Sequence, residues 1–386
     1  MRTIIYTGKG GVGKTSLSSS TALAAAKRGH RTLVMSTDSA HSLGDSLGTS
    51  LGPDPMPVAP NLDALEVDVL TEMERHWKEV YGYFTALLQS QGVEEITAKE
   101  FVVLPGMDMI AALLLLDEYK RQQRYDTVIM DTAPTADTLR LLSFPDVLRW
   151  YFEHFFKIQK RMVKVARPTV GKVMKTPLPT DRFFDAIQQL YDRSLSVREL
   201  LSDPRHSTVR LVVNPQKMVI SETQRAYTYL CLFGIPIEML VVNKVYPASS
   251  KDGYFAEVLK EQEQNLATIR EAFGDLPILT SPRYPYEVIG SERLTKLSTD
   301  VFGEKDPSAL FASTNPVRFT STKSGKAVSI ELPFAESEKL DVSLRGDTLY
   351  IRVGWHKRTI LLPYSYAGLK LGEARYVGGR LTVNFR

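Results

Sequence analysis

The sequence predicts an α/β protein with a mostly parallel sheet and helices on both faces, followed by an all-β region. Three observations support this prediction. A glycine-rich stretch, residues 8–15, lies between an apolar run and a helical pattern. Further apolar runs of strand length alternate with helical stretches. Beyond residue 314 the spacing of apolar residues changes from about 3.6 to 2, which is typical of antiparallel strands.

The composition narrows the class of protein. A chain of 386 residues with 43% hydrophobic and 24% charged residues is typical of globular proteins and long enough for two domains. The net charge of +4 gives no case for nucleic-acid binding. The longest apolar run, residues 109–116, is far shorter than the ~20 residues of a membrane span. Because a predicted strand begins at residue 2, we expect no signal or transit peptide. We therefore expect a cytoplasmic protein, or one of the plastid stroma if a transit peptide has been removed.

The glycine-rich stretch reads Gly-Lys-Gly-Gly-Val-Gly-Lys-Thr and matches the P-loop pattern G-x-x-x-x-G-K-[ST]. Its glycines allow backbone N–H groups to point into one cavity at the partly positive start of a helix. The pattern predicts an ATP site in which Lys14 contacts the β and γ phosphates and the Thr15 hydroxyl holds Mg²⁺. The candidate nucleotide-binding residues of this stretch are Gly8, Lys9, Gly10, Gly11, Val12, Gly13, Lys14, Thr15 and Ser16.

A second predicted strand, residues 31–37, ends at Asp38. A carboxylate at this position lies on the sheet edge where α/β folds bind ligands. Asp38 could orient or deprotonate an attacking water and contribute to Mg²⁺ binding. Alternatively, Asp38 and Ser39 could cap the following helix.

The segment between residues 49 and 84 carries weaker signals. Four prolines predict a loop over residues 49–60, and residues 65–67 predict a short strand. One helix with an apolar face should follow. That face comprises Leu70, Met73, Trp77, Val80, Tyr81 and Phe84.

Two more polar residues end predicted strands. Asp131 follows the buried run 127–130, an arrangement that positions Mg²⁺ directly or through water. With Thr15 and Asp38, Asp131 completes the candidate metal ligands. Asn243 ends the predicted buried strand 238–242, and its amide could bond the edge of adenine or could cap a turn.

Residues 144–201 contain two long stretches with a broad apolar helical face, separated by a proline-containing segment from 167 to 180. Such helices are most often core or dimer interface. An exposed apolar groove that binds a partner helix is the other interpretation.

Three motifs together resemble the family of ArsA ATPases and tail-anchored-protein-targeting ATPases, over about the first 302 residues. They are Lys-Gly-Gly-Val-Gly-Lys-Thr from Lys9, Asp-Ser-Ala-His-Ser from Asp38 and Asp-Thr-Ala-Pro-Thr from Asp131. The resemblance implies an ATPase with ATP and Mg²⁺, and a homodimer in which Lys9 reaches the partner's nucleotide. It also implies that Asp38 is catalytic, that the loop at Pro282 lies against adenine, and that helices 144–201 hold a hydrophobic client.

Two departures from the family pattern concern switching and dimerisation. Asp137 stands where the family has histidine after the third motif. The family's zinc-binding C-x-x-C is missing, because Cys231 is the single cysteine. A dimer must therefore close through other contacts.

Beyond residue 314, two stretches are distinctive: Leu-Asp-Val-Ser-Leu-Arg-Gly-Asp-Thr-Leu-Tyr-Ile-Arg-Val from Leu340 and Tyr-Val-Gly-Gly-Arg-Leu-Thr-Val from Tyr376. With them, residues 315–386 resemble an α-crystallin domain, the domain of small heat-shock proteins. We expect three parts: an ATPase domain over 1–302, a linker over 303–314 and a β-sandwich over 315–386. The resulting hypothesis is an ATP-hydrolysing homodimer that binds hydrophobic clients, among them tail-anchored membrane proteins. A metalloid-pump ATPase and a passive holdase with structural nucleotide are the alternatives. A soft metalloid requires several thiolates, which a single cysteine does not supply.

Overall fold

The computed structural model describes residues 1–38, 42–97, 107–133, 156, 177–247, 254–322 and 325–386. The first 302 residues form an eight-stranded sheet in the order β3-β4-β2-β5-β1-β6-β7-β8, parallel except for edge strand β3. Its strands are β1 (Arg2–Gly8), β2 (Thr32–Ser36), β3 (Met56–Ala59), β4 (Leu62–Glu66), β5 (Thr127–Asp131), β6 (Ser207–Val213), β7 (Ile237–Val245) and β8 (Ile278–Pro282). The predicted mostly parallel sheet is confirmed.

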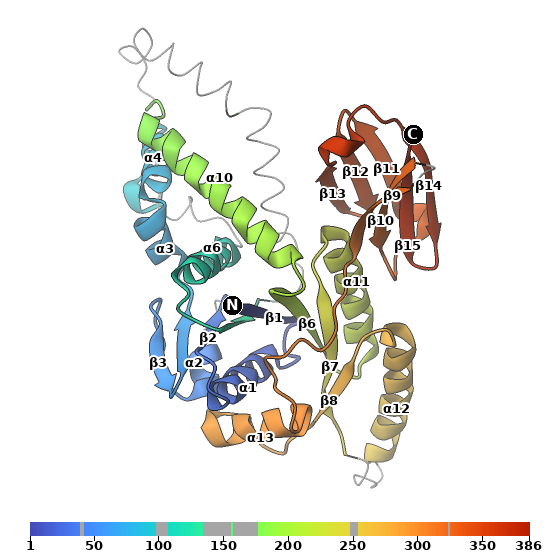
Figure 1. Cartoon of the computed structure of the whole chain (residues 1–386). Coiled ribbons are helices and arrows are strands. Elements are labelled where there is room, and N and C mark those ends of the chain that lie inside the picture. The colour runs from blue at the N-terminus through green and yellow to red at the C-terminus, as the bar shows by residue number, and fades with distance from the viewer. Residues whose placement is uncertain (39–41, 98–106, 134–155, 157–176, 248–253, 323–324) are drawn as a thin grey trace.

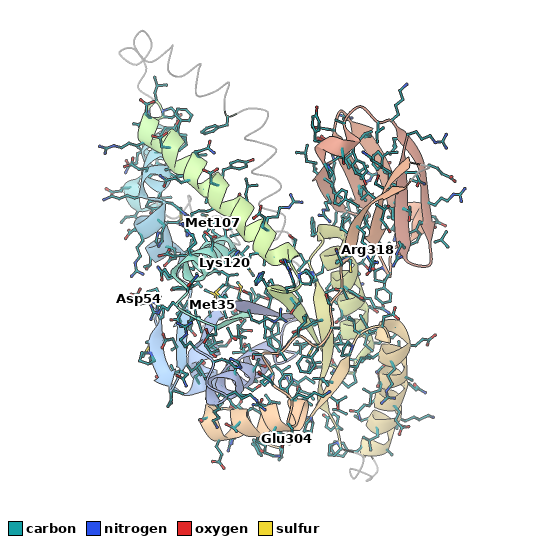
Figure 2. All side chains as sticks on the ribbon, in the orientation of Figure 1. Met35, Asp54, Met107, Lys120, Glu304 and Arg318 are labelled. Carbon is teal, nitrogen blue, oxygen red and sulfur yellow. The ribbon has the colours of Figure 1, made fainter. Side chains whose placement is uncertain are left out.

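Helices cover both faces of this sheet (Figure 1). The described helices are α1 (Lys14–Lys27), α2 (Ser42–Leu47), α3 (Val69–His76), α4 (Lys78–Ser90), α6 (Met107–Gln122), α10 (Asp181–Ser202), α11 (Lys217–Phe233), α12 (Tyr254–Phe273) and α13 (Gly290–Phe302). Helices α1 and α13 pack on one face, and α6, α10 and α11 pack on the other. In Figure 2, Met35 of β2 lies among the packed side chains, whereas Asp54 and Glu304 lie at the periphery.

The structure corrects the prediction for residues 49–84. The predicted loop contains β3, where Pro57 is tolerated because an edge strand leaves some N–H positions unpaired. The next strand covers Leu62–Glu66 rather than residues 65–67. The single predicted helix is two helices, because Trp77 leaves helical geometry at φ −127°. Of the predicted apolar face, Leu70 and Phe84 are 47% and 41% exposed, while Met73, Trp77 and Tyr81 are buried.

The carboxyl-terminal strands form two antiparallel sheets, β14-β15-β10-β9 and β11-β12-β13. Their bounds are β9 (Val317–Thr322), β10 (Gly325–Glu331), β11 (Leu340–Arg345), β12 (Thr348–Val353), β13 (His356–Leu361), β14 (Leu371–Val377) and β15 (Arg380–Phe385). Two 3₁₀ turns, Ser337–Lys339 and Tyr364–Tyr366, lie between strands. Alternate residues such as Val328, Ile330 and Leu349 are fully buried, which confirms the predicted all-β region.

The segment between the two regions is held against the sheet. Arg210 of β6 and Glu238 of β7 form a fully buried ion pair at 2.6 Å. The Arg210 guanidinium also donates to the Pro307 carbonyl at 2.7 Å, and the Phe311 N–H donates to Glu238 at 3.2 Å. These bonds fix residues 307–311 because the buried charges need all of these partners.

Helix α11 belongs to the first region and packs against the carboxyl-terminal sheets. Its Leu232 is buried in the core of the carboxyl-terminal sheets. The Arg358 guanidinium of β13 donates to the Leu232 carbonyl, where a cation is favoured by the partial negative charge of a helix end. The His356 ring lies 3.6 Å from the ring of Tyr229, centroid to centroid. In the described part of the chain, no helix is long and apolar enough to cross a bilayer.

Candidate functional site

The glycine-rich loop joins β1 to α1, as predicted. Gly11 and Gly13 adopt φ values of 79° and 98°, which side-chain-bearing residues rarely adopt. A Cβ on Gly13 would lie 2.2 Å from the Asn243 side-chain nitrogen, and a Cβ on Gly8 would lie 2.4 Å from the Val212 carbonyl oxygen. Helix α1 has no side-chain cap at Gly13. Its first N–H groups are therefore available to an anion.

Lys14, in this loop, interacts with Asp131 at the end of β5. The Lys14 side chain is buried, and its ammonium donates to the Lys9 carbonyl at 3.3 Å. Burial lowers the pKa of Lys14, although Asp131 and Asp38 oppose this shift. Asp131, at the end of β5, is 1% exposed. Burial raises the pKa of Asp131 to about 7, while Thr15 and Lys14 lower it and Asp38 raises it further.

Neither oxygen of the Asp131 carboxylate has a hydrogen-bond partner of good geometry among the described residues, although the Thr15 hydroxyl is close enough to lower its pKa. A buried carboxylate without partners is costly, unless a ligand completes its surroundings. Hard divalent cations take oxygen ligands of this kind. The neighbouring Thr15 hydroxyl supplies a further oxygen, at 3.2 Å from the Ser42 hydroxyl. The pair thus fits a Mg²⁺ site.

Asp38 reaches the same centre from the next strand. In the sheet, Asp131 lies beside Ser36 of β2 and beside Tyr6 of β1. Asp38 follows Ser36 by two residues, is half-buried, and its N–H donates to the Ser36 hydroxyl at 3.1 Å. Its charge acts on both Lys14 and Asp131. Three elements thus bring two carboxylates and one ammonium together, although residues 39–41 and 134–137 lie outside the described residues.

Lys9 lies at the rim of the loop. Its ammonium is 3.6 Å from the Glu222 carboxylate on α11, and both side chains are about one-third exposed at 34% and 31%. An ion pair at this distance and exposure contributes little stability. Lys9 is therefore held within its own chain by a contact that is easily broken.

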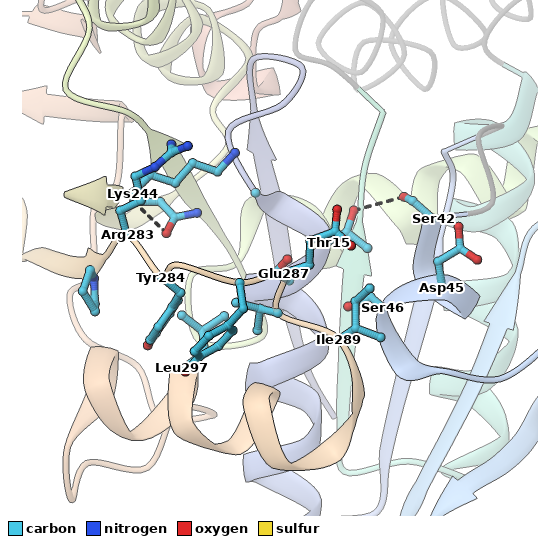
Figure 3. Close-up of a pocket in the computed structure, with 16 residues that line it drawn as sticks. Thr15, Ser42, Asp45, Ser46, Lys244, Arg283, Tyr284, Glu287, Ile289 and Leu297 are labelled. Atoms are coloured by element: carbon cyan, nitrogen blue, oxygen red, sulfur yellow. Dashed lines mark hydrogen bonds between the residues drawn. The ribbon is translucent and has the colours of Figure 1, made fainter. Parts of the chain in front are cut away.

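A cavity of about 600 Å³ opens beside the loop (Figure 3). Its lining includes Thr15 and Ser16 of α1, Asn243, and residues 282–284 and 286–289, among them Pro282. The rings of Tyr284 and Tyr286 stack at 5.4 Å, centroid to centroid. The predicted residues Asn243 and Pro282 thus border a space of suitable size for a nucleoside.

Asn243 and Lys244 also brace the loop. The Asn243 amide donates to the Val12 carbonyl at 2.8 Å, and its oxygen accepts from the Lys244 N–H at 2.9 Å. The Lys244 ammonium donates to the Gly11 carbonyl at 2.7 Å. Bracing is thus a role of Asn243 that the sequence analysis did not anticipate, and adenine contact stays a prediction. The sequence analysis also missed Lys244, Tyr284 and Tyr286. The sequence Tyr-Pro-Tyr at 284–286 could have indicated an aromatic surface.

The predicted helical client region is described in part. Residues 144–155 and 157–176 lie outside the described residues. Phe156 is buried against Phe184 of α10 at 5.7 Å between centroids. On the same helix, Phe183 lies 4.5 Å from Tyr83 and 6.1 Å from Phe84 of α4. An aromatic cluster that is partly exposed therefore joins α4 to α10.

Comparison with known proteins decides the family. Residues 1–303 match the ArsA ATPase family, described as anion-transporting ATPase. The chain belongs to the ArsA ATPase family. Residues 323–385 match the HSP20-like domain found in ArsA proteins. Both predicted resemblances are confirmed, and so is the assignment of the chain as an ATPase.

Relatives in the ArsA family match over most or all of the chain. A putative arsenical pump-driving ATPase of Chlorobaculum tepidum is 38% identical, over 100% of this chain and 96% of its own. The putative arsenical pump-driving ATPase 1 of Aquifex aeolicus is 34% identical, over 97% of each. ATPase GET3B of Arabidopsis thaliana is 32% identical, over 73% of this chain and 74% of its own. All three names describe an ATPase. Two of them add an arsenical pump, and the third does not.

Proposed function

We propose that this protein is an ATP-hydrolysing homodimer that binds hydrophobic, membrane-protein-like segments in a nucleotide-dependent way. The observation that carries the ATPase part is the convergence of Lys14, Asp38 and Asp131 at the P-loop. The observation that supports the client part is the partly exposed aromatic cluster of α4 and α10. Its ATPase domain extends over residues 1–302, followed by the linker 303–314 and the β-sandwich 315–386.

The site residues divide the work of hydrolysis. The N–H groups at the start of α1 and the Lys14 ammonium bind the phosphates and stabilise the charge that develops on them. Thr15 and Asp131, with help from Asp38, would hold Mg²⁺, which neutralises phosphate charge when bound. Asp38 orients the attacking water and accepts its proton. Asn243 keeps the loop in register through the Val12 carbonyl.

The proposed dimer gives Lys9 its role. Lys9 leaves Glu222 of its own chain and reaches the partner's nucleotide, where it neutralises charge during phosphoryl transfer. Breaking the contact between Lys9 and Glu222 costs little free energy, because both side chains are partly exposed.

The names of several relatives favour the metalloid-pump alternative. Cys231 argues against it, because this thiol is buried and its pKa is raised well above the usual value by burial.

The proposal is tested by ATP turnover and by binding of a model transmembrane peptide, both with the purified protein. Peptide affinity should differ between the ATP-bound and ADP-bound states, and turnover should be readily measured. A protein that binds the peptide without turning over ATP would instead be a passive holdase. Turnover that arsenite stimulates and the peptide leaves unchanged would support the pump.

Lys9 is expected to act across the dimer. We expect Lys9→Ala and Asp38→Asn protomers to be nearly inactive alone and to regain activity when mixed. In a mixed dimer, one site combines both defects and the other site has neither. The measurement is turnover of the mixture, with heterodimers confirmed by differential tags. Confirmed heterodimers without any recovered activity would place Lys9 in its own site.

Asp131→Asn is expected to stabilise the nucleotide-free protein at about pH 8. The Asp131 pKa is raised to about 7, so this group favours the folded state below its unfolded pKa of about 4. That contribution is lost as the pH rises through about 7. Asparagine carries no charge at any pH, so the variant does not lose this stability as the pH rises. Melting temperatures measured from about pH 5 to about pH 8 should therefore diverge, with the variant higher at the alkaline end.

Asp126→Asn is the matched control for this pH dependence. The Asp126 pKa is lowered to about 2 by its hydrogen bonds with Arg31, so its substitution should not stabilise the protein at about pH 8. A melting difference between wild type and Asp131→Asn that is constant with pH would contradict the prediction. The Asp131 variant should also lose Mg²⁺-dependent turnover.

A further inference from the structure

Positive charge is concentrated at the carboxyl-terminal end of the chain. Residues 315–386 contain 12 lysines and arginines against 6 acidic residues. The preceding residues contain 36 against 38. The overall net charge of +4 hides this asymmetry, which is typical of chains with one part that binds an anionic surface.

Part of this charge lies on one exposed sheet face. In β12, Leu349, Ile351 and Val353 point into the core, so Tyr350 and Arg352 point outward. Arg352 lies opposite Lys357 of β13, and Arg345 is exposed at the end of β11. We call the set Arg345, Tyr350, Arg352 and Lys357 the basic sheet face.

One acid shares this face and cancels one of its three positive charges. Asp341 of β11 lies opposite Arg352 in the ladder. Their charged atoms are 3.6 Å apart, with both side chains 60% exposed. Such an exposed pair contributes little free energy, but Asp341 still cancels one charge, so the three cations and one acid leave a net charge of +2. The face therefore remains positive.

A fully exposed tryptophan borders the basic sheet face. Trp355, in the turn between β12 and β13, is 100% exposed, and it precedes Lys357 by two residues. Tyr364, just beyond the other end of β13, is 95% exposed. Large aromatic side chains are seldom left wholly in water, because their burial is favourable. Tryptophan and tyrosine beside basic residues are characteristic of the interface between membrane and water.

The geometry fits a lipid surface better than a nucleic acid. Base stacking requires open aromatic faces on a platform. Tyr350 is the aromatic ring within the sheet face, and the Lys357 ammonium lies over it at 4.7 Å from the centroid. The exposed rings Trp355 and Tyr364 lie instead in connections outside the strands. Side chains at such positions can enter the headgroup layer.

We propose that the basic sheet face, with Trp355 as its anchor, docks on the surface of a bilayer containing anionic lipids. Arg345, Arg352 and Lys357 supply the attraction to the headgroups, which decays within a Debye length. Trp355 places its indole at the level of the headgroups. This inference rests on the charge and exposure of the carboxyl-terminal region and does not depend on the proposed function.

The test is flotation of the full-length protein with vesicles. The vesicles contain phosphatidylcholine alone or phosphatidylcholine mixed with phosphatidylglycerol. Binding is expected to the mixed vesicles only, and to be lost at ~1 M salt, where the Debye length is about 3 Å. The combined variant Arg345→Gln, Arg352→Gln and Lys357→Gln should lower the partition coefficient about 100-fold, since each cation near such a surface contributes a severalfold increase in affinity.

A matched control removes the same number of charges from the other sheet. Arg318→Gln, Arg375→Gln and Arg380→Gln act on β9, β14 and β15, and should reduce binding much less. Trp355→Phe should remove a blue shift of tryptophan fluorescence that the wild type shows with mixed vesicles. Unchanged ATP turnover in every variant would show that the chain is folded.

Three results would overturn the proposal. The first is equal binding to both kinds of vesicle. The second is an equal loss of binding in the control variant and in the variant of the basic sheet face. The third is binding to single-stranded RNA without binding to vesicles, which would assign the face to nucleic acid.

Discussion

Asp38→Asn is expected to bind ATP with near wild-type affinity and to hydrolyse it about 10²–10⁴ times more slowly. Asp38 follows β2 by two residues, and Ser36, the last residue of β2, lies beside Asp131 in the sheet. An amide at this position can still accept a hydrogen bond from water but cannot take its proton. The phosphate-binding groups of the loop are unchanged by the substitution. Single-turnover hydrolysis, with affinity measured separately by calorimetry, tests both halves of the prediction.

Asp45→Asn is the control for this experiment. Asp45 lies in α2, borders the same cavity and is exposed, and the proposed mechanism gives it no role. Its substitution should leave turnover within about twofold of wild type, as is usual for an exposed side chain. Near wild-type turnover of Asp38→Asn would leave Asp38 with the helix-capping role that the sequence also allowed.

Lys14→Ala is expected to weaken ATP binding on the order of 100-fold. The Lys14 ammonium is the buried cation nearest the start of α1, and charge-assisted bonds to phosphate are stronger than neutral ones. The substitution also removes a positive charge beside Asp131, so the Asp131 pKa should rise further. Calorimetric titration with ATP and Mg²⁺ measures the affinity, and circular dichroism verifies the fold.

Lys244→Ala provides a graded comparison. Lys244 reaches the same loop, where it donates to the Gly11 carbonyl. This bond is exposed, so its loss should weaken ATP binding only severalfold. Equal effects of the two substitutions would mean that loop shape, rather than the Lys14 charge, governs affinity. Undiminished binding by Lys14→Ala would refute the P-loop assignment.

Much of the fold could be predicted because local patterns suffice for it. Central strands such as β5 and β7 are buried on both faces and therefore read as apolar runs. The carboxyl-terminal strands alternate because one face of each meets a core. Prediction failed over residues 56–84, where an edge strand carries a proline and where one residue, Trp77, interrupts the helix. Breaks of a single residue leave the surrounding apolar spacing almost unchanged.

The sequence by itself determined the local geometry of the P-loop. Local sequence patterns predicted each of its parts: glycines at positions with positive φ, a lysine and a threonine at the start of a helix, and an acid at the end of a strand. Each of these features depends on neighbours within a few residues. Parallel strands then bring Asp38 and Asp131 to one sheet edge.

Only the tertiary structure decided which distant groups serve this loop. Asn243 and Lys244 brace it from 231 and 233 residues away, and Glu222 holds Lys9 from α11. The buried pair Arg210–Glu238, which fixes residues 307–311, likewise joins two strands and a later segment. Polar partners of this kind follow from the strand order and from the crossing of helices over the sheet. No local period encodes them, because hydrogen bonds and ion pairs depend on positions that are set only when the sheet is assembled.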